Sequence, residues 1–358
     1  CGNGKIDPGE LCYLPHVGYP SRIDPCAIAV GDLDNDGHID VAVPNSDFGH
    51  AEAPDNYASI LLGDGTGRLG DPIPYVAGGD YAVGISIGDV DDDGLQDLVV
   101  ANSDVGTINV LRALSPGVYG EPSGHAAGES PVMTAIADID NDGDLDLATT
   151  GNGSSEVIVR VGRGDGTFAP SRSYGIDAPW EVVLADLSGD GVADMAATAA
   201  YSDQVLVWLG NGDGTFAASG ALATAGTPYG LVAVDVDDNG RLDLVTANRA
   251  GSLTVFLSDS NWNMQRIDDS PVGAQPHSLA SGDFDMDGVL DIAAADDELN
   301  VVHVVLGNGS GDFTAAALYA VGTKPSNVRV GDLNEDGVLD LLTSDQYSNQ
   351  VGVLLSNP

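Results

Sequence analysis

The sequence is poor in positive charge and in large side chains. It has 12 Lys and Arg against 55 Asp and Glu, a formal net charge of −43, and only 6% aromatic residues in 358. So few cations argue against nucleic-acid binding, which needs clustered Lys and Arg to neutralise phosphates. The same lack argues against docking on anionic lipid. No apolar run approaches the roughly 18 to 20 residues that span a bilayer, so we expect no membrane insertion.

The abundant acids recur in a nine-residue motif, Asp-x-Asp-x-Asp-Gly-x-x-Asp. Seven copies begin at positions 32, 89, 138, 186, 235, 283 and 332, with Ser or Asn replacing one Asp in three of them. Short apolar runs flank each copy, as at residues 27–30 and 98–101, and a later run ends in Gly-Asp-Gly-Thr-Phe at 164–168 and 212–216. Such runs, bounded by Gly, Asp and Asn, predict strands joined by tight turns.

These repeats predict an all-β fold, a single seven-bladed β-propeller with four antiparallel strands per blade. We expect it to cover residues 24–358, with repeats starting near 24, 78, 128, 176, 225, 273 and 322. The seventh repeat ends after its third strand. We therefore expect residues 1–23 to supply a Cys-containing extension and an N-terminal strand that closes the last blade, which removes an open sheet edge.

The motif also predicts metal binding. Oxygen ligands at positions 1, 3, 5 and 9, a backbone carbonyl at position 7 and a turn-forming Gly at position 6 suit Ca2+. Position 12 is never Glu, which excludes an EF-hand. Asx turns without metal are the alternative, but clustered carboxylates with no Lys or Arg nearby would repel one another. We expect up to seven structural Ca2+ ions, one per blade.

The predicted ligands fall into seven sets, one for each copy of the motif. They are Asp32, Asp34, Asp36, His38 and Asp40; Asp89, Asp91, Asp93, Leu95 and Asp97; Asp138, Asp140, Asp142, Asp144 and Asp146; Asp186, Ser188, Asp190, Val192 and Asp194; Asp235, Asp237, Asn239, Arg241 and Asp243; Asp283, Asp285, Asp287, Val289 and Asp291; and Asp332, Asn334, Asp336, Val338 and Asp340.

These loops and turns resemble the FG-GAP/VCBS repeats of integrin alpha-subunit heads and of secreted bacterial proteins. The resemblance covers residues 24–358, although the Gly-Asp-Gly-Thr turn is lost at 114–117 and 258–262. It implies a calcium-binding propeller that is secreted or exposed on the cell surface. The family includes adhesion modules, lectins and scaffolds fused to enzymes, so the resemblance does not choose among these functions.

We expect the ligand to bind on the face opposite the Asp loops, because that face varies between repeats. The residue six before each loop should ring the channel mouth there: Cys26, Val83, Val132, Trp180, Tyr229, His277 and Ser326. Trp180, Tyr229 and His277, with Glu181 beside them, would suit a sugar. His50 and Glu52 lie in a loop that is longer in the first repeat. The alternative is that the aromatic residues only plug the channel.

Cysteine is scarce, with 3 residues. Cys1 and Cys12 could pair, which fits an oxidising exterior. Cys26 could instead pair with Cys12, or act as a nucleophile with His277 as its base.

Taken together, the sequence predicts a monomeric recognition module for a glycan or protein ligand. An extracellular polysaccharide lyase or hydrolase with its site at the channel mouth is the first alternative. A structural module of a larger surface protein is the second.

Overall fold

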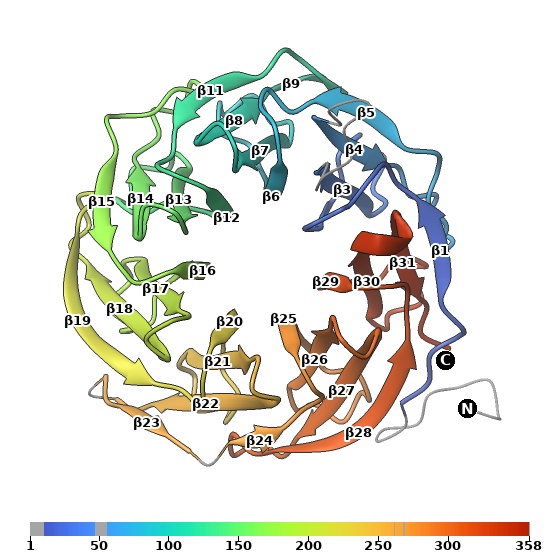
Figure 1. Ribbon diagram of the computed structural model, residues 1–358, viewed down its shortest axis with the longest axis vertical. Helices are drawn as coiled ribbons and strands as arrows, with labels where there is room; N and C mark the ends of the chain where they lie inside the picture. The colour runs from blue at the N-terminus through green and yellow to red at the C-terminus, as the bar shows by residue number, and fades with distance from the viewer. Residues whose placement is uncertain (1–10, 47–55, 261, 268, 358) are drawn as a thin grey trace.

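The computed structural model describes residues 11–46, 56–260, 262–267 and 269–357. In these ranges seven β-sheets radiate around a central axis, as Figure 1 shows in a view down that axis. The first strand of each sheet lies nearest the axis. The predicted all-β, seven-bladed architecture with four antiparallel strands per blade is confirmed.

The first three blades follow the chain from the inside outward. Blade 1 holds β2 (Ala29–Gly31), β3 (Asp40–Asn45), β4 (Tyr57–Leu61) and β5 (Ile73–Val76). Blade 2 holds β6 (Ala82–Gly88), β7 (Asp97–Asn102), β8 (Thr107–Leu111) and β11 (Ser123–Ala126), with an extra hairpin of β9 (Ala113–Ser115) and β10 (Val118–Tyr119). Blade 3 holds β12 (Pro131–Ala137), β13 (Asp146–Gly151), β14 (Glu156–Arg160) and β15 (Arg172–Gly175). The extra hairpin occupies the place where the second repeat has lost its Gly-Asp-Gly-Thr turn.

The next three blades repeat this plan. Blade 4 holds β16 (Pro179–Ala185), β17 (Asp194–Ala199), β18 (Gln204–Gly210) and β19 (Phe216–Ala223). Blade 5 holds β20 (Pro228–Val234), β21 (Asp243–Asn248), β22 (Ser252–Ser258) and an outer edge split into β23 (Met264–Arg266) and β24 (Ser270–Pro271). Blade 6 holds β25 (Pro276–Gly282), β26 (Asp291–Asp296), β27 (Val301–Gly307) and β28 (Phe313–Ala320).

The last blade joins the two ends of the chain. It contains β29 (Pro325–Gly331), β30 (Asp340–Asp345) and β31 (Gln350–Leu354), and its outer strand is β1 (Val17–Pro20), which pairs antiparallel with β31. Tyr13 adds an edge-to-face contact with Tyr319, at a ring-centroid distance of 5.0 Å. The predicted closure of the last blade by an N-terminal strand is therefore confirmed.

The core lies between neighbouring blades, where small and β-branched side chains pack sheet against sheet. Every residue of the second strand of each blade is buried, as in β3 and β7. At the closing seam Ile28 and Val41 of blade 1 pack in one cluster with Leu342 and Val353 of blade 7. Burial of apolar surface at each seam holds the ring together, because each Å2 removed from water contributes about 25 cal/mol.

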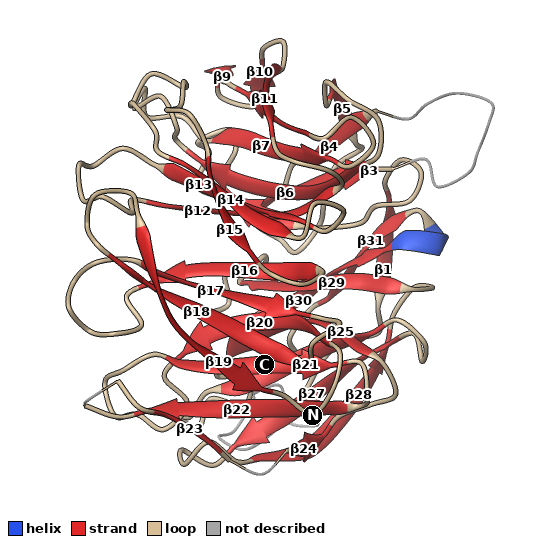
Figure 2. Ribbon diagram, turned by 60° about the vertical axis from the view of Figure 1, so that its left-hand side comes forward, coloured by secondary structure: helices blue, strands red, loops and turns tan. Residues whose placement is uncertain are grey.

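Helix is nearly absent from the described ranges, which contain only the short 3-10 turn η1 (Gln346–Ser348) between β30 and β31. In Figure 2 this turn is drawn in blue toward the right-hand side, beside β31. Nowhere in the described part of the chain is there a helix long and apolar enough to cross a membrane.

Candidate functional site: metal loops and channel mouth

Each Asp motif forms the turn between the first and second strands of its blade. In blade 2, Asp89 accepts hydrogen bonds from the backbone N–H groups of Asp93 (3.1 Å) and Gly94 (2.8 Å). Asp93 in turn accepts one from the N–H of Leu95 (2.9 Å). The fourth residue, Asp92, is left-handed with φ 56°, and Gly94 has φ 85°. A Cβ added at Gly94 would meet nothing within 4 Å, so backbone conformation, not space, requires this glycine.

The last Asp of each motif is buried and fastens the loop to the end of the third strand. Asp97 is fully buried and accepts hydrogen bonds from the N–H groups of Val90 (3.0 Å) and Ala113 (2.7 Å). Burial raises the pKa of this carboxyl group to about 6, and the two N–H bonds oppose that rise. The other copies repeat the pair of bonds: Asp40, Asp146, Asp194, Asp243, Asp291 and Asp340.

These two hydrogen bonds hold the Asp loop of each blade beside the turn that follows its third strand, so the loops and the turns lie on one face. The last Asp of the motif therefore has a structural role, which the pattern of metal ligands in the sequence does not indicate. The distance along the chain from the last Asp to the end of the third strand can be read from the sequence. The donors that bond to this Asp are backbone N–H groups, which every residue type except Pro carries, so no sequence motif identifies them.

Five of the seven loops bring three carboxylate groups close enough to share one cation. Their oxygens lie within 4.8 Å of one another in Asp32, Asp34 and Asp36; Asp89, Asp91 and Asp97; Asp138, Asp140 and Asp146; Asp235, Asp237 and Asp243; and Asp283, Asp285 and Asp291. An all-oxygen donor set of this kind suits a hard cation. The described residues of the loops at Asp186 and Asp332, where Ser188 and Asn334 replace an acid, form no such acidic group.

The expectation that no Lys or Arg lies near these loops is wrong. Arg112 forms an ion pair with Asp91, with 3.3 Å between Nη1 and Oδ2. Arg241 donates from Nη1 to the backbone carbonyl of Ser188 in the preceding loop (3.2 Å). Arg112 follows the third strand of its blade, outside the motif, and its ion pair partly offsets the repulsion between carboxylates. Arg241 is the seventh residue of the next motif copy, and its side chain links two neighbouring loops.

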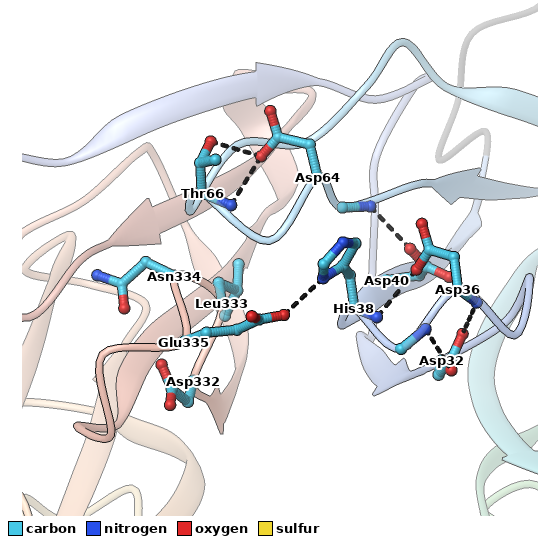
Figure 3. Close-up of polar contacts among 12 residues, drawn as sticks. Asp32, Asp36, His38, Asp40, Asp64, Thr66, Asp332, Leu333, Asn334 and Glu335 are labelled. Carbon is cyan, nitrogen blue, oxygen red and sulfur yellow. Dashed lines mark hydrogen bonds and ion pairs between the residues drawn. The ribbon is translucent and has the colours of Figure 1, made fainter.

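Neighbouring loops also contact each other around the ring. Figure 3 shows the seam between the first and last blades, where His38 Nδ1 lies 2.5 Å from Glu335 Oε1. The same picture shows Asp40 bonded to a backbone N–H, which belongs to Gly63 at 2.7 Å. His38 is the seventh residue of its motif, and its side chain bridges two blades.

At the opposite ends of the strands, one cavity of about 470 Å3 lies around the channel mouth. All seven residues expected to ring the mouth line it: Cys26, Val83, Val132, Trp180, Tyr229, His277 and Ser326. The indole of Trp180 stacks on Tyr229, with ring centroids 4.3 Å apart and planes 12° apart. His277 meets both rings edge-on, at 5.3 and 5.1 Å. The three aromatic residues from blades 4, 5 and 6 thus form one cluster.

Two polar atoms in this aromatic cluster are buried without hydrogen-bond partners in the described structure. They are Trp180 Nε1 and His277 Nδ1. Burial lowers the pKa of His277 to about 4, with Asp297 opposing the change and Arg249 adding to it. His277 is therefore neutral near pH 7, and its imidazole packs against Trp180 and Tyr229.

Three charged residues outside the predicted ligand site also line this cavity: Arg249, Asp297 and Lys324. Arg249 pairs with Asp297 at 3.1 Å and lies over the ring of Tyr229 at 4.9 Å. Lys324 lies over Tyr347, 4.5 Å from its ring centroid, and donates to the Tyr347 hydroxyl at 3.2 Å. For Arg249 and Lys324, the only signal in the sequence was that Lys and Arg are rare in this chain.

Glu181 lies apart from the mouth cavity. It lines a second space of about 550 Å3 among the innermost strands, together with Arg329. Burial raises the pKa of Glu181 to about 7, and the charge of Arg329 lowers it. The structure therefore separates Glu181 from the cavity that Trp180 lines, although the two residues are adjacent in β16. His50 and Glu52 lie outside the described residues.

Cys26 is a free thiol, which rules out its pairing with Cys12. Its sulfur lies 3.1 Å from the hydroxyl of Ser46, and burial raises the pKa of the thiol to about 12. A thiol with so high a pKa carries almost no thiolate at neutral pH, so a nucleophilic role has no support. Cys1 lies outside the described residues.

Comparison with known proteins agrees with the repeat pattern. An FG-GAP-like repeat model matches five overlapping segments, 89–149, 138–197, 186–246, 235–294 and 283–343. No curated protein sequence matches the chain.

Among solved structures the chain is similar to a periplasmic gluconolactonase of Pseudomonas aeruginosa, with TM-score 0.64, 19% identity and 84% and 86% of the two chains covered. It is also similar to virginiamycin B lyase of Staphylococcus aureus, with TM-score 0.63, 13% identity and 95% and 98% covered. A third similar structure is an Agrocybe aegerita lectin that recognises terminal N-acetylglucosamine, with TM-score 0.53, 20% identity and 89% and 82% covered. At these identities the likeness concerns the fold. The repeat matches span residues 89–343, well over half of the sequence, and the chain belongs to the FG-GAP-like repeat family.

Proposed function

We propose that this protein is a calcium-stabilised recognition module that binds a glycan in the cavity at its channel mouth. The observation that carries this proposal is the contrast between its two faces. One face repeats an Asp loop of nearly constant sequence in every blade, whereas the seven positions around the mouth hold six different residue types and line one cavity of about 470 Å3. Asymmetry of this kind on a symmetric scaffold is typical of a ligand site.

The chemistry of the mouth favours a sugar. Trp180 and Tyr229 offer flat apolar surface, and aromatic rings of this kind bury large areas while keeping a polar edge. Ser103, Ser130 and Asn152 line the same cavity and carry groups that can bond to hydroxyls. The similar lectin binds a sugar, whereas the similar gluconolactonase and lyase are enzymes, so the fold by itself does not favour binding over catalysis.

Calcium would act on the scaffold. Five loops hold three clustered carboxylates each, and Ca2+ binding there would offset their repulsion and brace the turn between the first two strands. The loops at Asp186, Asp235 and Asp332 carry three carboxylates at the ligand positions instead of four and would bind Ca2+ more weakly. A secreted or surface location, where Ca2+ is plentiful, fits this requirement.

The test is retention on immobilised glycans, measured for the wild type, Trp180→Ala and His277→Ala in constant calcium. We expect both substitutions to weaken retention at least tenfold, since each removes part of the cavity wall. Leu318→Ser is the matched control, because Leu318 is 62% exposed on the outer strand of blade 6. Circular dichroism would verify that each variant is folded. Unchanged retention in both mouth variants would contradict the proposal, and retention on a protein partner alone would replace the glycan by a protein ligand.

An extracellular polysaccharide lyase or hydrolase is the competing proposal. Glu181, with its pKa raised to about 7 by burial, favours it, and this residue lines the inner space between the first strands and not the mouth cavity. The same glycan panel should therefore be assayed for new reducing or unsaturated ends. Turnover that is lost in Glu181→Gln would favour the enzyme, and a bound glycan that stays intact would favour recognition.

A further inference from the structure

We infer that the ligand of the mouth cavity is an acidic glycan, whose carboxylate is recognised by Lys324. This inference rests on the proposed function and narrows its ligand to sugars of the uronic acid class. It depends on the geometry around Lys324 and on the distribution of charge at the mouth.

Lys324 is held in a fixed position at the edge of the cavity. Its backbone is left-handed, with φ 56°, as is the backbone of the equivalent residue in five other blades, for example Tyr81 and Thr227. Two hydrogen bonds fix it there: the N–H of Lys324 donates to Asn300 Oδ1 (2.7 Å), and its carbonyl accepts from the N–H of Gln346 (3.0 Å). The fold of this turn is shared by the blades, whereas a Lys side chain at this position occurs only in the last one and lines the cavity there.

The ammonium group of Lys324 has donors to spare. It gives one hydrogen bond to the Tyr347 hydroxyl, and an ammonium carries three donors. Among the described residues no carboxylate lies within ion-pair distance of it. Arg249 differs in this respect, because Asp297 already neutralises it.

The described residues that line the mouth cavity carry one positive charge in excess, on a strongly acidic molecule. The described residues lining the cavity include two cations, Arg249 and Lys324, and one carboxylate, Asp297. The positive charges of Arg249 and Lys324 both act on His277, which places them around the aromatic cluster. Of the carboxylates that do not line the cavity, Asp24 acts on Cys26, as Lys324 does with the opposite sign. Ionic screening weakens the field of acids farther than about 10 Å at 0.1 M salt.

A sugar carboxylate fits this arrangement better than an acidic peptide does. The site is a concave cavity of about 470 Å3 beside stacked rings, of a size typical for small ligands. A pyranose ring can lie against an aromatic side chain while its carboxylate reaches the ammonium of Lys324. Polar side chains of the wall, such as Asn152, would then bond to its hydroxyls.

The experiment is calorimetric titration with oligogalacturonate and with the same oligosaccharide after reduction of its carboxyl groups. Both titrations use the full chain in constant calcium. A charged hydrogen bond contributes about 1.5 to 3 kcal/mol, so Lys324→Gln should weaken oligogalacturonate binding roughly tenfold or more. It should change binding of the reduced sugar less than about twofold. The control is Arg68→Gln, which removes an exposed cation from the Asp-loop face.

The outcomes test the acidic-glycan inference separately from the proposed glycan recognition on which it rests. Preference for the acidic oligosaccharide that disappears in Lys324→Gln, but not in Arg68→Gln, supports the inference. Equal affinity of the wild type for both sugars overturns the inference and leaves glycan recognition standing. Binding of neither sugar nor any glycan overturns both. Equal binding of poly-glutamate would show that the site reads a carboxylate on a peptide, and would overturn the glycan assignment.

Discussion

Val17 lies directly opposite Val353 in the outer half of blade 7, so the beginning and the end of the described chain share one sheet. This pairing lets the ring close without leaving β31 as an open edge. It also makes the stability of the last blade depend on residues at the far end of the sequence.

Removing the residues before Ser21 should destabilise the ring. The truncation removes β1 and the Tyr13 contact with Tyr319, and it exposes the backbone of β31. We expect a fall in Tm of roughly 5 °C or more, with faster aggregation, measured by calorimetry and light scattering. Val17→Thr is the control, because the side chain of Val17 is 50% exposed and its backbone pairing survives. A truncated chain as stable as the wild type would mean that β1 contributes nothing to closure.

Chelation of calcium should lower the stability of the whole propeller. If several loops bind Ca2+ only in the folded state, excess EDTA should lower Tm by about 10 °C or more. Titration of the metal-free protein with Ca2+ should reveal several sites, and Asp89→Asn should weaken or remove one of them. Asp64→Asn is the control, since Asp64 lies on the same face in a turn outside the acidic clusters. A Tm unaffected by EDTA would show that the loops hold no structurally important metal.

Three glycines should respond differently to alanine, because they are present for different reasons. Gly94→Ala forces a left-handed alanine into open space and should cost about 1 to 2 kcal/mol. Gly84→Ala places a Cβ 2.1 Å from the carbonyl oxygen of Val132, between the inner strands of blades 2 and 3, and should cost about 3 kcal/mol. Gly175→Ala meets nothing within 4 Å and has no positive φ, so it should be neutral. Denaturant unfolding measures all three, and an equal loss at Gly94 and Gly175 would refute the conformational argument.

Glu181 should make stability depend on pH. Its pKa rises from 4.5 to about 7 on folding because burial disfavours the charged form. The folded state thus holds the proton more tightly than the unfolded state. The resulting stabilisation is fully present below about pH 4.5 and is lost as pH rises through 7. Glu181→Gln should therefore flatten the decline in unfolding free energy between about pH 4.5 and pH 7. Glu121→Gln, at an exposed carboxylate, should leave that decline unchanged. If the Glu181 variant keeps the wild-type slope, the carboxyl group does not titrate in this range.

Cys26 should be unreactive in the folded protein. Burial raises the pKa of its thiol to about 12, so the reactive thiolate is scarce at pH 8. We expect slow modification by a disulfide reagent under native conditions and rapid modification in guanidinium chloride. Fast labelling of the native protein would revive the nucleophile that the sequence left open.

The sequence by itself determined the architecture of this protein, because the architecture is local and repeated. The Asp motif, its period and the apolar runs beside it indicated seven blades and the acidic loops. The left-handed Asp92 and the glycine Gly94 follow from rules that act within a few residues. Even the ring of mouth residues, including Trp180 and Tyr229, could be placed by counting back from each loop.

Only the tertiary structure decided which side chains from different blades come together. The burial of Asp97 beneath two backbone N–H groups, the reach of Arg112 to Asp91 and the cation Lys324 at the mouth depend on the closed ring. The tertiary structure also places two adjacent residues in different spaces: Trp180 lines the mouth cavity, whereas Glu181 lines the second space among the innermost strands, together with Arg329. The sequence period determines contacts within a blade. Contacts between blades depend on how the sheets pack and on closure of the ring, and a short stretch of sequence does not determine either.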